Sequence, residues 1–379
     1  MSRRGPGEGS VFQRADGLWA GSVSIGWGRE GRKRRYVYGH TQNEALAKLR
    51  KLQAQLGLGL PVVDEKVTLG AFLGRWLGVV EPRLRPSTFT RYAGLVRGQI
   101  VPKLGSVRLA QLQPGDVGRM MAGVQADGLS PRTASHCRAV LRAALADAEK
   151  WGEIPRNVAK LADAPHMPPP QPVVLSPDQV REILGALTEP GLRRLAIVAL
   201  HSGLRLGEEL GLRWVDVDLD GHSLHVRQCL QRLGGTYELV EPKSSTSRRV
   251  VPLTEAAVEA LREERREQLA AQLAAGGRWR EPIPGLVFTT ATGEPRNGPS
   301  LTHLFQKALS RAGLPKLRWH DLRAAHGSLL LASGADISVV SRRLGHSSVS
   351  LTSRHYGGVS EALQQDATDR LARMLQQPG

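Results

Sequence analysis

The second half of the chain contains four short fragments whose residue types could act together on a phosphate ester. Each carries a guanidinium, an ammonium or an imidazole group, and a tyrosine follows the last of them. The fragments are 202-SGLRLGE-208, 242-PKSS-245, 320-HDLR-323 and 344-LGH-346, with Tyr356 ten residues further on. An enzyme that cuts a phosphodiester without water needs a nucleophile, cations for the transition state and an acid for the leaving oxygen. The fragments and Tyr356 together contain all three kinds of group.

Two arginines and two histidines are suited to contact the phosphate. The guanidinium groups of Arg205 and Arg323 are planar, permanently charged and offer paired donors to the non-bridging oxygens. His320 lies three residues before Arg323, so the two side chains share one face of a helix and can reach the same phosphate. His320 and His346 can donate to the phosphate, and His320 can also accept a proton from a phenol. Each of these residues alone is a weak signal in a chain with eleven histidines and many arginines.

Lys243 stands out because it is the only lysine between Lys160 and Lys307, where the other cationic side chains are arginine or histidine. A lysine ammonium can give up a proton near neutral pH when its pKa is lowered, whereas a guanidinium cannot. Lys243 is therefore the candidate general acid for the leaving oxygen. It lies between two predicted strands, and we expect it in a β-hairpin. The alternative is a solvated lysine in a turn.

The composition favours a polyanionic partner. The chain has 52 Lys plus Arg against 35 Asp plus Glu, a net charge of +17, and such basic proteins usually bind nucleic acid. An arginine-rich coding bias is the alternative. The two cysteines, Cys137 and Cys229, exclude a disulfide scaffold and indicate a reducing, cytoplasmic setting. No apolar run reaches the ~18 residues of a membrane span. We therefore expect no membrane association. No acidic cluster has metal-ligand spacing, so we also expect no metal and no cofactor.

The elements that must position these residues fall into three domains, and the first, residues 1–60, is small. Strands are predicted at 11–12, 18–25 and 32–38, and a helix at 42–56. A glycine-rich loop is expected between the second and third strands. We expect the third strand to lay cationic side chains on DNA, with a solvated basic hairpin as the alternative. These side chains are Arg32, Lys33, Arg34 and Arg35.

The second domain, residues 64–162, has helical periodicity throughout. Thr68 is a candidate helix cap, and Ser87 or Thr88 is another. Two further helices are predicted at 116–124 and 130–151. The last helix has Cys137 on its apolar side and a charged face that contacts either DNA or only solvent. The cations of this face are Arg132, Arg138 and Arg142.

A proline-rich linker, residues 163–172, precedes the third domain, residues 173–379. Ser176 with Pro177 predicts a helix start. This domain is expected to be mainly α-helical with a small antiparallel sheet. The main elements predicted in it are a helix at 195–201, strands at 223–230, 236–240 and 248–253, and a helix at 254–274. The expected fold is thus multidomain: a small sheet-plus-helix module, an all-α domain and a mainly α domain.

The four fragments and Tyr356, in this order and spacing, resemble the active site of the tyrosine recombinase (phage integrase) family. The resemblance covers the whole third domain. The helical domain is similar to the family's core-type DNA-binding domain, and the first module resembles the arm-type DNA-binding domain of the longer integrases. A single fragment such as His-x-x-Arg arises by chance, but the complete set is specific.

The resemblance implies a site-specific recombinase that integrates or excises a mobile element without metal or ATP. The implied catalytic residues are Arg205, Lys243, His320, Arg323 and His346. Tyr356 would be the nucleophile, forming a 3′-phosphotyrosine on the way to a Holliday junction. Glu208 would orient Arg205, with Glu209 as the alternative.

The implied partners are double-stranded DNA at core-type and arm-type sites and three further copies of the chain, which form a homotetramer on DNA. A host DNA-bending factor and a directionality factor are also implied, with the protein at the nucleoid. An apolar stripe in residues 361–375 would pack on its own domain or on a neighbouring subunit.

Two departures from the family pattern concern residues beside the site. The family often has a polar or histidine residue where Ala324 stands, and a histidine two residues after the tyrosine, where Gly358 stands. Three other interpretations remain open from the sequence. They are a dimer-resolving recombinase, which usually lacks the first module, a type IB topoisomerase, and a non-catalytic DNA-binding protein.

Overall fold

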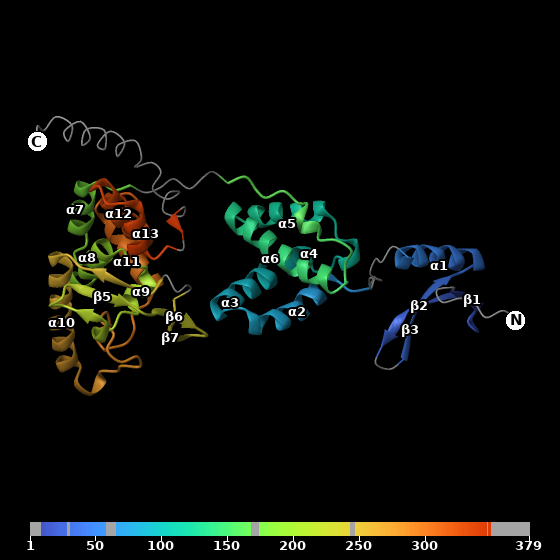
Figure 1. Cartoon of the computed structure of the whole chain (residues 1–379), viewed down its shortest axis with the longest axis horizontal. Coiled ribbons are helices and arrows are strands. Elements are labelled where there is room, and N and C mark those ends of the chain that lie inside the picture. Colours follow the sequence, from blue (N-terminus) through green and yellow to red (C-terminus); the bar gives the residue numbers. More distant parts are fainter. Residues whose placement is uncertain are drawn as a thin grey trace, which may run out of the picture. The chain divides into compact units, whose positions relative to one another are not determined.

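The computed structural model describes residues 9–28, 31–57, 66–167, 174–242, 247–346 and 348–349 (Figure 1). The chain divides into two compact units, Met1–Pro169 and Pro170–Gly379. The first unit contains two separate hydrophobic cores, one in the N-terminal module and one in the helical domain. The second unit has one large core and a small apolar cluster beside it. Within these described ranges, no helix is both long enough and apolar enough to cross a membrane.

The N-terminal module is a three-stranded antiparallel sheet with one helix on one face (Figure 1). Val23 from the sheet packs against Leu49 and Leu52 from the helix, because the two periodicities place these residues on facing sides. The predicted sheet-plus-helix fold is confirmed. The elements are β1 (Ser10–Gln13), β2 (Trp19–Gly28), β3 (Gly31–Gly39) and α1 (Gln42–Gly57).

The strands β2 and β3 extend further than the sequence predicts. Gly28 pairs with Gly31, so most of the expected glycine-rich loop belongs to the two strands. Gly31 adopts a φ of +117°, a conformation that residues with a side chain rarely take. Residues 29 and 30 of the expected loop lie outside the described residues.

The helical domain packs its helices around Phe72, Trp76 and Leu141, all fully buried. Cys137 lies in the same core, as its place on the apolar stripe predicts. Thr68 caps the first helix, where its hydroxyl accepts from the N–H of Ala71. The helices are α2 (Leu69–Val80), α3 (Pro86–Leu95), α4 (Val101–Leu104), α5 (Pro114–Ala126) and α6 (Pro131–Lys150), with a π-helical turn at Val96–Ile100.

The predicted cap of α3 is wrong. Neither Ser87 nor Thr88 caps this helix, which begins at Pro86 with Arg85 in the cap position. Proline has a fixed φ and no N–H, so it fits the first turn of a helix and moves the start ahead of the two hydroxyl residues.

The third domain is mainly α-helical, as predicted, with its core formed by residues such as Leu195, Leu261, Phe305 and Leu322. Ser176 caps α7 as predicted, accepting from Gln179. The helices are α7 (Pro177–Ala186), α8 (Pro190–Ser202), α9 (Leu206–Leu210), α10 (Glu255–Ala275), α11 (Gly298–Arg311), α12 (Trp319–Ala332) and α13 (Ile337–Leu344). The strands are β4 (Val217–Asp218), β5 (Ser223–Val226), β6 (Cys229–Leu233), β7 (Thr236–Val240) and β8 (Arg249–Pro252).

The strands of this domain depart from the prediction in two ways. The single strand expected at 223–230 is broken, and its halves β5 and β6 belong to different sheets, in the orders β4-β5-β8 and β6-β7. The strands on either side of Lys243, β7 and β8, therefore do not pair with each other, so the expected hairpin at that position is wrong. A local apolar pattern identifies a strand but not its partner, which depends on distant residues.

Candidate active site

Arg205 occupies the sharp junction between α8 and α9. The junction begins at Gly203, whose φ of +66° is left-handed. A Cβ atom there would lie 2.5 Å from Cδ2 of His326 and 2.8 Å from Cδ2 of Leu344. The position therefore requires glycine for space as well as for conformation. Two residues later, Arg205 begins α9 with its side chain 39% exposed, so the junction fixes the point at which this charge leaves the core.

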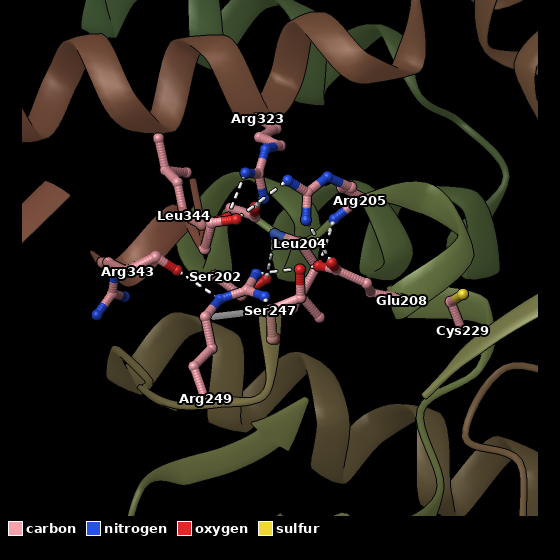
Figure 2. A network of polar contacts seen from close by, with 12 residues as sticks. Ser202, Leu204, Arg205, Glu208, Cys229, Ser247, Arg249, Arg323, Arg343 and Leu344 are labelled. Atoms are coloured by element: carbon pink, nitrogen blue, oxygen red, sulfur yellow. Dashed lines mark hydrogen bonds and ion pairs between the residues drawn. The ribbon is translucent and has the colours of Figure 1, made fainter. Parts of the chain in front are cut away.

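Glu208 holds both the backbone and the guanidinium of Arg205 (Figure 2). Its Oε1 accepts from Nη1 of Arg205 at 2.6 Å, and its Oε2 accepts from the backbone N–H at 3.1 Å. Oε2 also accepts from Nη2 of Arg249 at 3.0 Å. Burial would raise the pKa of the Glu208 carboxyl, but the charges and hydrogen bonds of Arg249 and Arg205 hold the pKa below its ordinary value. The neighbouring Glu209 instead accepts from Nε1 of Trp319 at 3.0 Å.

Arg323, on α12, is buried and contacts both the α8–α9 junction and the end of α13. Its Nη1 donates to the carbonyl of Gly203 at 2.5 Å, and its Nη2 donates to the carbonyl of Leu344 (Figure 2). Arg205 contacts the next carbonyl, since its Nη2 donates to Gly345 at 3.3 Å. The two arginines from distant parts of the sequence thus converge on one turn.

That turn leads directly into His346. Gly345 is left-handed, its N–H donates to Arg342 at 2.9 Å, and the N–H of His346 donates to Ser341 at 3.0 Å. These two hydrogen bonds form a Schellman motif, which ends α13 in a defined geometry. The backbone of His346 is consequently fixed immediately after the residues that Arg205 and Arg323 contact.

His320 lies at the start of α12, one turn before Arg323, and remains exposed at the surface. Desolvation by the residues around the imidazole, together with the charges of Arg323, Arg318 and Arg205, lowers the pKa of His320. The influence of both Arg205 and Arg323 on this pKa indicates that the three side chains are electrostatic neighbours. A lowered pKa favours the neutral imidazole, which can accept a proton.

Two of the predicted catalytic residues, Lys243 and Tyr356, lie outside the described residues, as does the apolar stripe at 361–375. The structure brings together Arg205, Glu208 and Arg323. His320 and His346 lie at the start of α12 and directly after α13.

The predicted DNA-binding residues of the N-terminal module follow β3. Arg34 is exposed and Arg35 is half-buried. Arg32 and Lys33 belong to the same strand, but their side chains lie outside the described part of the structure.

The predicted DNA-binding residues of the helical domain lie on α6. Arg132 and Arg142 are exposed, and within the described ranges neither forms an ion pair. Arg138 is half-buried, and its Nε has no hydrogen-bond partner among the described residues. Burial and the charges of Arg91 and Arg132 lower the pKa of His136, which contacts Arg91. This helix therefore carries three arginines, Arg132, Arg138 and Arg142, that form no ion pair with an acidic side chain of the described residues.

Two arginines that link Glu208 to the end of α13 and to α12, Arg249 and Arg343, are not predicted from the sequence. Arg249 joins Glu208 to the carbonyl of Arg343. Arg343 in turn donates from Nε to Nε2 of His326 at 2.9 Å. Burial, above all, lowers the pKa of His326 to about 3, so its imidazole stays neutral and accepts this hydrogen bond. No local pattern marks Arg249 or Arg343, because their partners include distant residues: Glu208 is 41 positions from Arg249, and His201 is 142 positions from Arg343.

Across the described residues, no group of three or more histidine, cysteine, aspartate or glutamate side chains could hold a metal ion.

Comparison with known proteins identifies the class. A model described as the "Phage integrase family" matches residues 173–362, and one for the "Phage integrase, N-terminal SAM-like domain" matches residues 68–120. A "Tyrosine recombinase XerC-like" protein of Caldanaerobacter subterraneus is 29% identical over 369 residues, covering 92% of this chain and 94% of that protein.

Solved structures give the same fold. The Tn1549 transposon integrase, in complex with a circular intermediate DNA, superposes with a TM-score of 0.67 at 20% identity, covering 80% of this chain and 100% of that one. A lambda integrase tetramer bound to a Holliday junction gives a TM-score of 0.59 at 18% identity, covering 93% and 96%.

The fold is that of the tyrosine-type site-specific DNA recombinases. The chain belongs to the phage integrase family. A protein of Saccharopolyspora erythraea described as "Integrase" is 25% identical over 427 residues, covering 98% of this chain and 97% of that protein. Among the functions left open by the sequence, the family model and this relative favour the integrase over the dimer resolvase, the topoisomerase and the non-catalytic protein.

Proposed function

We propose that Tyr356 carries out the cutting and rejoining of DNA. Its phenolic oxygen would attack the phosphorus and form a 3′-phosphotyrosine bond, while the bond to the 5′ oxygen breaks and that oxygen takes a proton from Lys243. Attack by the 5′-hydroxyl of a partner strand reverses the step. The phosphotyrosyl bond retains the energy of the phosphodiester, so ATP is not needed. Exchange of one strand pair before the other gives a Holliday junction.

The observation that carries this proposal is the convergence of Arg205 and Arg323 on the turn before His346. Two guanidinium groups at one place can bind both non-bridging oxygens and stabilise the charge of the transition state. His346, which follows this turn, would donate to the same phosphate.

His320 would accept the proton of the Tyr356 phenol. Support comes from its lowered pKa, which favours the neutral imidazole, and from the proximity of Arg205 and Arg323. Glu208 would orient Arg205 rather than transfer protons, because two guanidinium groups hold its carboxylate in the ionised form.

The test is covalent trapping on a nicked duplex that carries the core site, recovered beforehand by selection of random-sequence DNA on the full-length protein. The nick lets the 5′-hydroxyl fragment diffuse away, so the phosphotyrosine accumulates. We predict that the wild type is trapped and that Tyr356→Phe binds with equal affinity but is not trapped. Arg205→Gln and Arg323→Gln should reduce the rate of trapping by about 10²–10³-fold.

Tyr237→Phe is the matched control, since it removes another phenol of the same domain and should leave trapping unchanged. If the wild type binds the duplex and no covalent adduct forms, the protein is a DNA-binding protein without this activity.

We infer that different domains of the chain bind different DNA sites. The helical domain, residues 64–162, and the catalytic domain, residues 173–379, would bind core-type sites, and the module at residues 1–60 would bind arm-type sites. The lambda integrase neighbour is a tetramer on a Holliday junction, and a homotetramer is the assembly proposed for this chain. A host DNA-bending factor and a directionality factor would assist it at the nucleoid in the cytoplasm.

The open face of the N-terminal sheet supports an arm-site role. Cross-strand pairing places Arg34, Tyr36 and Tyr38 of β3 on the face opposite α1, and the guanidinium of Arg14 lies 5.3 Å from the ring centre of Tyr38. Aromatic and cationic side chains on one exposed face are suited to contact a DNA backbone.

Footprinting tests this division. Full-length protein should protect core-type and arm-type DNA, and a 64–379 truncation should protect only the core type. Retention of the arm footprint by the truncation would assign arm binding to another domain.

A further inference from the structure

We propose that Arg249 is a positioning residue for strand transfer, which fixes Glu208, and through it Arg205, to the end of α13. This inference rests on the proposed function of Arg205. Arg249 does not occur in the set of phosphate-contacting residues that the sequence predicts, and its position suggests no contact with DNA, since its side chain is only 7% exposed.

Arg249 uses all three of its nitrogen atoms to join separate segments. Its Nε donates to the carbonyl of Arg343 at 2.6 Å, and its Nη2 donates to Oε2 of Glu208 at 3.0 Å (Figure 2). Its Nη1 donates to the carbonyl of Ser247 at 3.0 Å. One guanidinium therefore connects the start of β8 with α9 and with the end of α13.

The end of α13 is bound by three guanidinium groups in succession. Arg249 contacts the carbonyl of Arg343, Arg323 that of Leu344, and Arg205 that of Gly345. Carbonyls in the last turn of a helix lack partners within the helix and carry the negative end of its dipole. Because the three donors occupy consecutive carbonyls, the position of each arginine depends on the other two.

The charge balance around Glu208 gives Arg249 a further effect on Arg205. The buried carboxylate divides its two oxygens between Arg205 and Arg249. Without Arg249, a buried negative charge would be left with Arg205 as its only cation among the described contacts. The carboxylate would then hold that guanidinium more strongly and keep it from the phosphate.

The decisive measurement is the single-turnover rate of covalent trapping at saturating protein, on the nicked core-site duplex described above. We expect Arg249→Gln to lower this rate by about 10–100-fold, as residues that orient a functional group commonly do. DNA affinity should stay within about threefold of the wild type, since Arg249 is buried. Arg249→Lys keeps the charge beside Glu208 but not the three-way geometry, and should give an intermediate rate.

A double variant separates positioning from mere structural support. If Arg249 acts through Glu208, Glu208→Gln combined with Arg249→Gln should be no slower than the slower single variant, because the two losses share one cause. Independent structural roles would instead multiply the two losses. Arg248→Gln is the matched control: this adjacent arginine is exposed and pairs only with the exposed Glu241 in the described structure, so the trapping rate should not change.

The outcomes are distinct. Trapping of Arg249→Gln at the wild-type rate, or multiplicative losses in the double variant, overturns the inference while the proposed function stands. Loss of cooperative thermal unfolding in both Arg249→Gln and Arg249→Lys makes Arg249 a folding residue and also overturns it. Failure of the wild type to trap removes the proposed function and the inference together.

Discussion

Two adjacent carboxyl groups in α9 experience opposite electrostatic environments. Burial raises the pKa of Glu209 well above its ordinary value, and the hydrogen bond from Trp319 offsets this only in part. Glu208 is also buried, but Arg249 and Arg205 hold its pKa below the ordinary value. The neutral form is thus favoured at the residue that packs α9 against α12, and the charged form at the residue that binds Arg205.

This contrast predicts a pH dependence of stability. The folded-state pKa of Glu209 exceeds its unfolded value near 4.5, so the folded protein binds this proton more tightly. The resulting stabilisation is complete below about pH 4.5 and is lost as the pH rises through the folded-state pKa. Glu209→Gln keeps an acceptor for Trp319 but does not ionise.

We therefore expect Glu209→Gln to gain stability over the wild type as the pH rises, by about 2–4 °C in Tm for each kcal/mol. Thermal unfolding of both proteins over a pH series checks this. Parallel curves for the two proteins would contradict the prediction.

At the residue scale, the sequence predicts those site residues that lie within short motifs. The choice of Glu208 over Glu209 as the partner of Arg205 agrees with the hydrogen bonds of the structure. Arg249 could not be predicted, because its importance depends on the approach of β8 to both α9 and α13. The roles of Lys243 and Tyr356 remain predictions.

At the scale of elements, the path of the chain between α8 and α9 depends on Gly203. Gly203→Ala should cost about 1–2 kcal/mol for the left-handed backbone and a further ~1–3 kcal/mol for the collision with His326 and Leu344. The added methyl group would displace the backbone around Gly203, including Arg205 and the Gly203 carbonyl that Arg323 contacts. The rate of covalent trapping should therefore also fall.

Gly313→Ala provides the matched control. Gly313 has a similar φ of +70°, but a Cβ atom there meets nothing within 4 Å. In denaturant unfolding, Gly313→Ala should lose only the free energy that the left-handed backbone costs, and its rate of trapping should equal that of the wild type. Equal losses of stability in the two variants would show that close packing at Gly203 is unimportant.

The helices were the most predictable elements. The expected helix at 42–56 and the one at 254–274 agree with α1 and α10 to within one residue at each end, because helical periodicity is set by neighbours three and four positions apart. The strands were less predictable. The break between β5 and β6 follows from their pairing with β8 and β7, which no local pattern contains.

At the scale of the whole molecule, the net charge of +17 predicts a strong dependence of DNA binding on salt. Each phosphate neutralised contributes a slope of about −0.9 in a plot of log K against log salt concentration. The double variant Arg132→Gln/Arg142→Gln should therefore make the slope shallower by roughly two.

Arg262→Gln/Arg266→Gln on α10 is the control with the same loss of charge, since these arginines already pair with Glu255 and Glu259. Its slope should equal that of the wild type. Titrations of core-site DNA by fluorescence anisotropy provide the measurement. A wild-type affinity that does not change with salt concentration would indicate that the positive charge reflects coding bias and not DNA binding.

The sparse core of the N-terminal module has a thermodynamic consequence. Its core cluster consists of the buried side chains of Val23, Leu49 and Leu52, with Val11, Val37 and Leu56 partly buried beside them. The other buried apolar residues of the module among those described are two alanines, Ala20 and Ala45. So small an interior leaves the folding equilibrium of this module close to balance. Any ligand that seats on its open face then raises the population of the folded form by mass action. The melting temperature of this module therefore rises as the fraction of the module that is bound to ligand rises.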